Sequence, residues 1–118
     1  LAQRGTIFRD SEAPTLANPF YGFEVLAAAG YVVVLADMIG FGESDDQIHP
    51  YYNKEASHQT VVDLLRAAVE FMNNENLLQS EKCFLFGYSQ GGYSTLATLQ
   101  EMERLNPLGY PITAAAAG

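Results

Sequence analysis

The chain has 118 residues, of which 48% are hydrophobic, and its 14 acidic and 6 basic side chains give a net charge of −8. Phosphate groups repel an acidic chain, so we expect neither nucleic acid nor an anionic membrane surface as a partner. No stretch approaches the ~18 consecutive apolar residues of a membrane helix, and we expect no transmembrane segment. The only cysteine, Cys83, excludes an internal disulfide.

The first part of the chain predicts a strand, a loop, a helix and a second strand. Residues 1–6 are expected to end a strand, and residues 7–18 to form a polar loop. An Asn-Pro pair supplies an N-cap and a first-turn proline for a helix over residues 18–29, which Gly30 stops. Residues 31–36 predict the second strand, because their β-branched valines favour extended backbone.

A long loop over residues 37–56 precedes a second helix, which an Asn-Asn pair ends. Its apolar side chains form one stripe: Val61, Val62, Leu65, Ala68, Val69 and Met72. Residues 82–86 predict a third strand and residues 112–117 a fourth. The helix between them carries apolar residues at spacings of mostly three until Asn106-Pro107 stops it: Tyr93, Leu96, Ala97, Leu99, Met102 and Leu105. Strands that alternate with helices predict an α/β fold, a mostly parallel sheet with helices on both faces. In this sheet residues 31–36, 82–86 and 112–117 are expected to be parallel neighbours, because right-handed helical crossovers connect them.

The most informative segment is the turn between the third predicted strand and its helix, Gly87-Tyr88-Ser89-Gln90-Gly91. A Gly-x-Ser-x-Gly sequence between a buried strand and a helix predicts a nucleophile elbow, a sharp turn that lifts a serine out of the sheet. We expect Ser89 to have a positive φ, a cramped conformation that requires small residues two positions before and after it. Gly87 and Gly91 meet that requirement. A glycine-rich turn with an incidental serine is the plainer alternative.

Three stretches together resemble the α/β-hydrolase superfamily, and within it the secreted bacterial esterases and lipases. The elbow is one of them. Residues 30–44, a strand followed by an Asp-x-x-Gly-x-Gly-x-Ser loop, are similar to the segment before the elbow in that superfamily, and Arg4-Gly5-Thr6 looks like its oxyanion loop. Because this fold usually needs about 200 residues or more, the resemblance implies that residues 1–118 are part of a single α/β-hydrolase domain, truncated at both ends. It also implies a secreted or periplasmic location.

The resemblance also assigns roles to individual residues. Ser89 is the expected nucleophile, and we expect no cofactor and no metal. The backbone N–H of Gln90, at the N-terminus of a helix, is the expected first oxyanion donor. Thr6 is the candidate for the second donor, since Gly5 lets the backbone approach the substrate. Related enzymes often carry His-Gly where this chain has Arg4-Gly5.

Other polar residues have a structural interpretation beside a functional one. Asp37 could be a catalytic acid, but its place before a Gly-x-Gly loop favours a carboxylate that accepts hydrogen bonds from loop N–H groups. His49 could line a pocket, and a surface-loop histidine is the preferred interpretation. His58 lies at a helix start among polar residues and is predicted to be exposed. Three loop carboxylates lack the spacing of a calcium loop and are expected to be solvated: Glu43, Asp45 and Asp46.

The chain contains no histidine after Ser89. The order of nucleophile, acid and base in this fold then places the triad Asp and His beyond Gly118, and residues 1–118 alone are expected to be inactive. The predicted function is hydrolysis of carboxylic esters through an acyl-enzyme, with a small-molecule or lipid ester as substrate. A peptidase or acyltransferase of the same fold is one alternative, and a non-catalytic hydrolase-like binding module is another.

Overall fold

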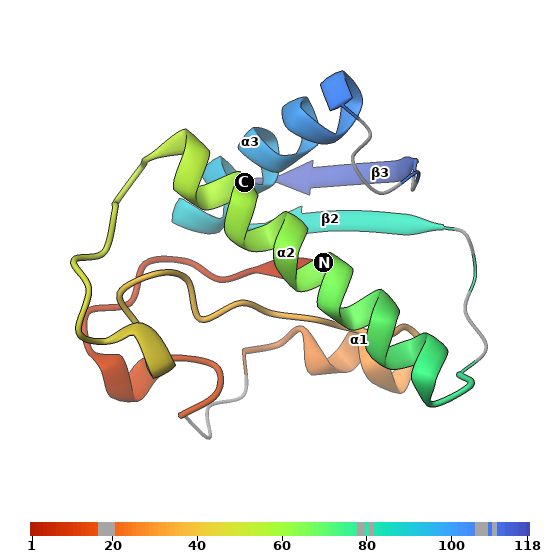
Figure 1. The fold of residues 1–118 in the computed structure, drawn as a ribbon, viewed down its shortest axis with the longest axis horizontal. Coiled ribbons are helices and arrows are strands. Elements are labelled where there is room, and N and C mark those ends of the chain that lie inside the picture. Colours follow the sequence, from red (N-terminus) through yellow and green to blue (C-terminus); the bar gives the residue numbers. More distant parts are fainter. Residues whose placement is uncertain (17–20, 78–79, 81, 106–108, 110) are drawn as a thin grey trace.

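The computed structural model describes residues 1–16, 21–77, 80, 82–105, 109 and 111–118. Its sheet has three parallel strands in the order β1 (Ala2–Gln3), β2 (Cys83–Gly87) and β3 (Ile112–Ala117). Figure 1 shows the three strands side by side, with helices packed around them. The predicted α/β class with a parallel sheet is confirmed.

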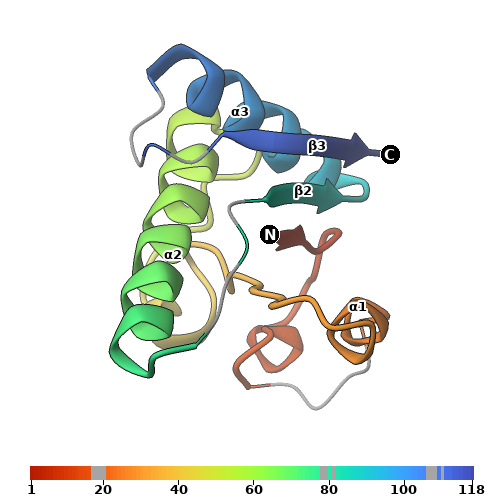
Figure 2. The ribbon, with the colours of Figure 1, turned by 90° about the vertical axis from the view of Figure 1, so that its right-hand side faces the viewer.

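Helices lie on both sides of this sheet. The long α2 (Lys54–Asn74) and the short α1 (Glu24–Ala28) lie on opposite sides of the strands (Figure 2). The third helix, α3 (Gln90–Leu105), packs against all three strands and against α2. Two single-turn 3₁₀ helices lie in loops, η1 (Asp10–Glu12) and η2 (Gly42–Ser44). Among the described residues no helix is both long and apolar enough to cross a membrane.

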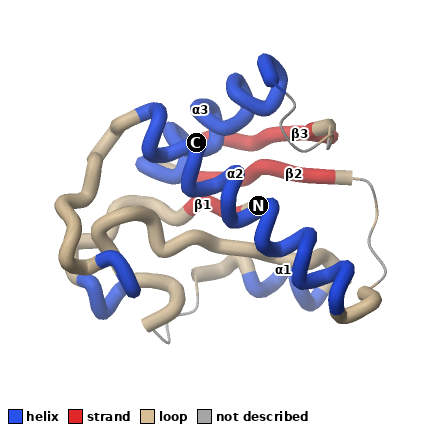
Figure 3. The backbone as a smooth tube through the Cα atoms, viewed as in Figure 1, coloured by secondary structure: helices blue, strands red, loops and turns tan. Residues whose placement is uncertain are grey.

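The predicted strand over residues 31–36 does not form a regular strand, and Figure 3 draws this segment as loop. Leu35 forms only an isolated parallel bridge, with Ala2. Because β1 also pairs with β2, it lies between this segment and β2, and the predicted direct pairing with residues 82–86 is wrong. The short β1 offers few hydrogen-bonding partners, and Val32 is left 57% exposed.

The boundaries of α1 and α3 can be compared with the predicted stops. Gly30 has a φ of 91° and donates its N–H to the Ala27 carbonyl at 3.0 Å, so this glycine ends α1 as predicted. The predicted N-cap and proline at residues 18–19 lie outside the described residues, and α1 begins only at Glu24. The predicted stop at residues 106–107 also lies outside them.

The predicted apolar stripe of α2 is confirmed. The Asn53 side chain caps the helix by accepting a hydrogen bond from the Ala56 N–H at 3.0 Å, so α2 begins slightly earlier than predicted. Four members of the stripe are buried and two are half-buried: Val61, Val62, Leu65 and Met72, then Ala68 and Val69. Val62 and Leu65 form the hydrophobic core with Cys83 of β2 and Met102 of α3.

The predicted apolar face of α3 is partly wrong. Leu96 and Leu105 are 57% and 55% exposed, whereas Ser94, Thr95 and Thr98 are buried. The reason is the short distance between α3 and β2, since a Cβ added at Gly87 would lie 2.6 Å from the Thr95 hydroxyl oxygen. Only small side chains fit in that space. The face of α3 toward the sheet therefore carries small side chains, some of them polar, instead of large apolar ones.

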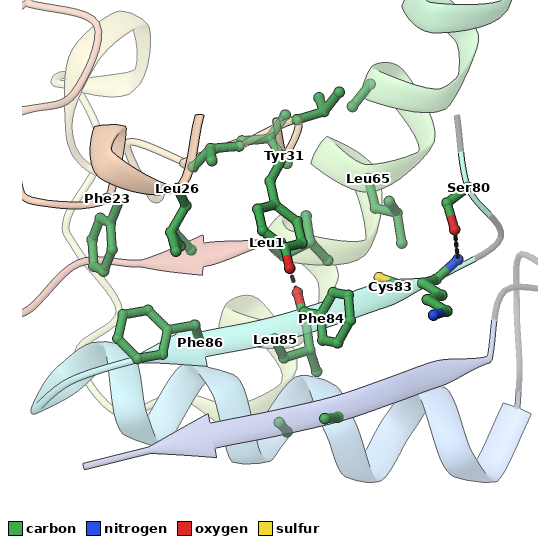
Figure 4. A pocket seen from close by; sticks show the side chains of 18 of the residues that line it. Leu1, Phe23, Leu26, Tyr31, Leu65, Ser80, Cys83, Phe84, Leu85 and Phe86 are labelled. Carbon is green, nitrogen blue, oxygen red and sulfur yellow. Dashed lines mark hydrogen bonds between the residues drawn. The ribbon is translucent and has the colours of Figure 1, made fainter. Parts of the chain in front are cut away.

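The two faces of β2 are packed differently. Cys83 and Leu85 are buried, whereas Phe84 and Phe86 on the other face are 37% and 42% exposed. The exposed face borders an apolar cavity of about 720 Å³ between α1 and α2 (Figure 4). Phe23 covers part of it, with its ring edge-on to Phe86 at a centroid distance of 5.4 Å. A five-residue helix, α1, is too short to cover the rest.

Candidate active site

Ser89 lies at the junction between β2 and α3 and belongs to neither element. Its φ is 56°, in the left-handed region that residues with a side chain seldom adopt. The residue is exposed, immediately before the first turn of α3. The predicted position and the predicted positive φ are both confirmed. Strained backbone of this kind persists only where the surrounding structure holds it in place.

Three glycines allow the strand, the turn and the helix to approach one another. A Cβ at Gly87 would lie 2.3 Å from the Gly91 carbonyl oxygen, and a Cβ at Gly91 would lie 2.0 Å from that of Gln3. A Cβ at Gly92 would lie 2.5 Å from the Gly118 carbonyl oxygen. These distances are far below van der Waals contact, so a side chain at any of the three would push α3 away from the sheet.

Backbone hydrogen bonds hold Ser89 from both sides. Its N–H donates to the Gly118 carbonyl at 2.7 Å, and the Gly118 N–H donates to the Gly87 carbonyl at 3.0 Å. The Ser89 carbonyl accepts from the Tyr93 N–H of α3 at 3.1 Å. The end of β3 and the first turn of α3 together fix the position of this serine.

The loop that follows β1 reaches the same place. A Cβ added at Gly5 would lie 3.8 Å from the Ser89 Cβ, and the next residue, Thr6, is half-buried. Within the described part of the chain, no acceptor pairs with the backbone N–H of Thr6 or of Gln90. The loop after β1 therefore passes beside Ser89, and Thr6 and Gln90 each keep a free backbone N–H.

Arg4 is buried and holds this loop. Its Nη1 donates to the Gly5 carbonyl at 3.0 Å and its Nη2 to the Asp37 carbonyl at 2.5 Å. The guanidinium also lies 4.8 Å from the centre of the Phe41 ring. Burial lowers the pKa of Arg4 below its ordinary value, and the charge of Asp37 acts against this. Arg4 thus ties the Gly5 loop to the segment after Leu35.

Asp37 has a structural role, as preferred from the sequence, but with different partners. Its Oδ1 accepts the Thr15 N–H at 2.9 Å, and its Oδ2 accepts the Thr15 hydroxyl. The predicted partner loop is held by other side chains: the Gly42 N–H donates to Asp10 Oδ1 at 2.6 Å. Nothing in the sequence indicated that the loop around Thr15 folds back onto Asp37.

His49 is not the surface-loop histidine that was preferred from the sequence. It is half-buried, and its Nδ1 lies 2.6 Å from the Ile39 carbonyl oxygen, which can only accept a hydrogen bond. Nδ1 therefore carries the proton, and Nε2, which lies 2.6 Å from Gln90 Nε2, accepts from that side-chain amide. Sequence analysis missed this contact between the long loop and the elbow.

Three tyrosines, Tyr51, Tyr52 and Tyr93, make further contacts beside the elbow. The Tyr51 hydroxyl lies 3.0 Å from Thr6 Oγ1, and the Tyr93 hydroxyl donates to the Tyr52 carbonyl at 2.7 Å. The hydrogen bond with Thr6 holds the pKa of the Tyr51 phenol below its ordinary value. The rings of Tyr51 and Tyr52 are about half exposed, with a centroid distance of 4.4 Å. In the sequence, only the aromatic residues Tyr51 and Tyr52 shortly after His49 pointed to these contacts.

His58 was predicted to be exposed, and that prediction is wrong. It is 5% exposed because α2 packs against α3 on this side, and its Nε2 lies 3.1 Å from Glu55 Oε2. Glu101 of α3 is also buried and pairs with Arg104. At a rise of ~1.5 Å per residue, Glu101 lies about 18 Å along α3 from Ser89 and is not a triad carboxylate.

The remaining polar candidates do not form a metal site among the described residues. Glu43, Asp45 and Asp46 are exposed on their loop, and the described residues contain no group of three or more side chains suited to hold a metal ion. Burial raises the pKa of the Cys83 thiol above its ordinary value. The apolar cavity is lined by neither Ser89 nor Gln90. It is separate from the serine.

Comparison with known proteins identifies the family. The family model described as the prolyl oligopeptidase family matches residues 19–106. A candidate hydrolase from Legionella pneumophila is 34% identical with a TM-score of 0.88, over 99% of this chain and 32% of its own. The rice cell wall degrading esterase LipA from Xanthomonas oryzae is 36% identical with a TM-score of 0.72, over 76% of this chain and 23% of its own.

An N228W mutant of the same esterase aligns over 96% of this chain and 30% of its own, with 26% identity and a TM-score of 0.75. A search of curated proteins finds no significant match. The chain thus spans about a third of the length of the solved structures that it matches over nearly all its residues. It belongs to the prolyl oligopeptidase family, within the α/β-hydrolase superfamily.

Proposed function

We propose that residues 1–118 are the nucleophile-bearing part of one larger domain that hydrolyses carboxylic esters, with Ser89 as the nucleophile. One observation carries this proposal: an exposed serine in a left-handed conformation, held between the end of β2 and the first turn of α3. A structural serine has no need of that strained position, whereas a nucleophile gains access to substrate from it. The likeness to an esterase supports an ester as substrate.

In the proposed reaction, Ser89 Oγ attacks the carbonyl carbon of the ester and the carbonyl oxygen becomes an oxyanion. The free N–H groups of Gln90 and Thr6 donate to that oxygen, and the N-terminal end of α3 adds a favourable partial charge. The bond to the alcohol oxygen then breaks, the alcohol leaves with a proton, and the acyl group stays on Ser89. Water hydrolyses this acyl-enzyme and restores the free serine.

The proton transfers need a base. His49 and His58 are the histidines of residues 1–118, and each has its Nε2 engaged, with Gln90 and Glu55 respectively. We propose that the base and its carboxylate partner come from chain outside residues 1–118, in the order that this fold uses. Residues 1–118 alone are then expected to be nearly inactive.

The direct test is Ser89→Ala in the complete protein, assayed with a short-chain p-nitrophenyl ester. Loss of the nucleophile leaves only oxyanion and binding contributions, so kcat should fall by about 10⁴-fold or more. A matched control is Ser94→Ala, which removes the hydroxyl of a buried serine in α3 and leaves the turn at Ser89 unchanged. A Ser89→Ala protein that kept its rate would refute the assignment, whereas a complete, unmutated protein with no hydrolase activity would favour the non-catalytic binding module.

A peptidase is the second candidate, and the family match is the observation that favours it. The elbow serves acyl transfer from either an ester or an amide, because both pass through a tetrahedral oxyanion. The two are separated by comparing kcat/KM for an ester and an amide of the same acyl group. An ester hydrolase should prefer the ester by far more than the difference in intrinsic reactivity, and a peptidase should not. The secreted or periplasmic location stays a prediction.

A further inference from the structure

One segment of the long loop contacts both proposed oxyanion donors. Residues 49–52 contact Gln90 through His49 and Thr6 through Tyr51. Gln90 follows β2 and Thr6 follows β1, so the two residues belong to different parts of the chain. We call residues 49–52 the bridging segment, because it joins the turn after β2 to the loop after β1.

The contact with Gln90 involves a buried side chain. Gln90 is 4% exposed, and its Oε1 has no hydrogen-bond partner among the described residues. His49 Nε2 accepts from the Gln90 amide and so fixes which way that side chain points. A free glutamine in the first turn of a helix can turn its carbonyl onto an unpaired N–H, because helix N-termini leave such donors open. By engaging the amide, His49 leaves the Gln90 backbone N–H available to a substrate.

The contact with Thr6 fixes the second donor. Thr6 lies in a loop that has no regular secondary structure, beside a glycine. Its side chain has one described partner, the Tyr51 hydroxyl at 3.0 Å. An oxyanion donor is effective only when it is held before the reaction begins, and a loop residue needs a side-chain anchor to be held. Tyr51 supplies that anchor.

Hydrogen bonds and ring packing hold the bridging segment in place. The Tyr51 N–H donates to the His49 carbonyl at 2.9 Å, and the Tyr93 hydroxyl of α3 donates to the Tyr52 carbonyl at 2.7 Å. Tyr52 has a φ of 53°, a left-handed turn residue, and the Phe41 ring packs on His49 at 4.9 Å. A segment fastened to α3 and to its own turn can set the distance between two donors.

We propose that residues 49–52 are a positioning element of the oxyanion hole, in which His49 orients Gln90 and Tyr51 orients Thr6. The inference rests on the proposed function, because it assigns Gln90 and Thr6 as the donors. His49 and Tyr51 are positioning residues, since they act on substrate only through those two. Such residues affect the transition state, where the oxyanion exists, more than substrate binding.

The test of His49 compares two substitutions in the complete protein. His49→Phe keeps a ring against Phe41 but removes the acceptor for Gln90, and kcat should fall roughly 10-fold with KM changed less than about 2-fold. His49→Gln restores an acceptor and should recover kcat to within about 3-fold of the original. Equal kcat values for the two variants, or a loss confined to KM, would overturn the role of His49.

The test of Tyr51 is a double-mutant cycle with Thr6. It does not depend on the His49 variants folding well, because it removes the hydroxyl of Tyr51, a residue that is half exposed. Tyr51→Phe and Thr6→Val should each lower kcat roughly 5-fold, and the double variant should be no slower than either single one. Tyr31→Phe, remote from Ser89 on the cavity face, is the control and should leave kcat unchanged. Multiplicative losses, or no loss, would overturn the role of Tyr51.

Failure of this inference is distinguishable from failure of the proposed function. If Ser89→Ala is inactive while the His49 and Tyr51 variants keep their kcat, only the positioning role is wrong. If Ser89→Ala keeps its rate, the proposed function itself is wrong, and the positioning role is refuted with it.

Discussion

The two faces of β2 show how differently one strand can be packed. On the face toward α3, Leu85 is 1% exposed and Gly87 meets α3 so closely that no side chain would fit. On the other face, Phe84 and Phe86 border an open apolar cavity and are 37% and 42% exposed. The closed face carries the candidate nucleophile at its end, whereas the cavity on the open face is lined mostly by apolar side chains.

The difference follows from which parts of the chain cover each face. The closed face is covered by α3, which follows β2 after two residues, and the elbow is completed by the end of β3. The open face depends on α1, which lies far away in the sequence and has five residues. A site that needs fixed geometry is thus built on the side where neighbours in the sequence are also neighbours in space.

The largest expected effect on stability is at the closed face. Gly91→Ala places a Cβ 2.0 Å from the Gln3 carbonyl oxygen, a backbone atom that can move only if β1 or α3 moves. We expect a loss of about 3–5 kcal/mol in the free energy of unfolding, at the upper end for overpacking. Denaturant unfolding measures it.

Gly5→Ala is the matched control for this prediction. Its Cβ would meet its nearest neighbours at 3.7 and 3.8 Å, ordinary contact distances. We expect a change of less than about 1 kcal/mol. Similar losses for Gly91→Ala and Gly5→Ala would mean that α3 is not pressed onto β1 as described.

The second prediction compares the two faces of β2 directly. Leu85→Ala should cost about 3 kcal/mol, because it leaves a cavity in a closed core. Phe86→Ala removes a larger side chain but one that is 42% exposed, and should cost about 1–2 kcal/mol. Thermal or denaturant unfolding of both variants decides it. An equal or larger loss for Phe86→Ala would remove the contrast between the faces.

The smallest predicted effect is a gain in stability on α3. The Thr98 side chain is fully buried, and its hydroxyl has no hydrogen-bond partner among the described residues. Thr98→Val should therefore raise the free energy of unfolding by about 1 kcal/mol, because an unpaired buried hydroxyl is removed at nearly constant volume. The control is Thr60→Val on α2, whose hydroxyl donates to the Ala56 carbonyl at 2.8 Å and whose loss should destabilise slightly. A loss for Thr98→Val would show that its hydroxyl has a partner.

The parts of the molecule that are local in sequence could be predicted. The positive φ of Ser89, the glycines around it and the end of α1 at Gly30 all follow from short-range geometry. The parallel pairing of β2 and β3 follows from the helix that connects them. For the same reason the resemblance, which rests on short motifs, predicted the α/β-hydrolase superfamily correctly, while the prolyl oligopeptidase family within it was not predicted.

The errors concern contacts between distant segments. His49 was expected at the surface because it lies in a long loop, and only the path of residues 37–53 brings it onto Gln90. His58 appeared exposed because nothing in α2 alone indicates that α3 covers it. The segment over residues 31–36 has strand-forming residues but too short a partner in β1. Local pattern carries no information on any of these pairings.

The central claim is that Ser89 is a reactive nucleophile, and covalent labelling tests it most directly. A fluorophosphonate reacts with an activated serine by forming an oxygen–phosphorus bond as fluoride leaves. In the complete, active protein, peptide mass spectrometry should find the adduct on Ser89, and esterase activity should disappear in proportion to labelling. A labelled and inactivated protein with its adduct on another serine, or an active protein with Ser89 unlabelled, would contradict the account.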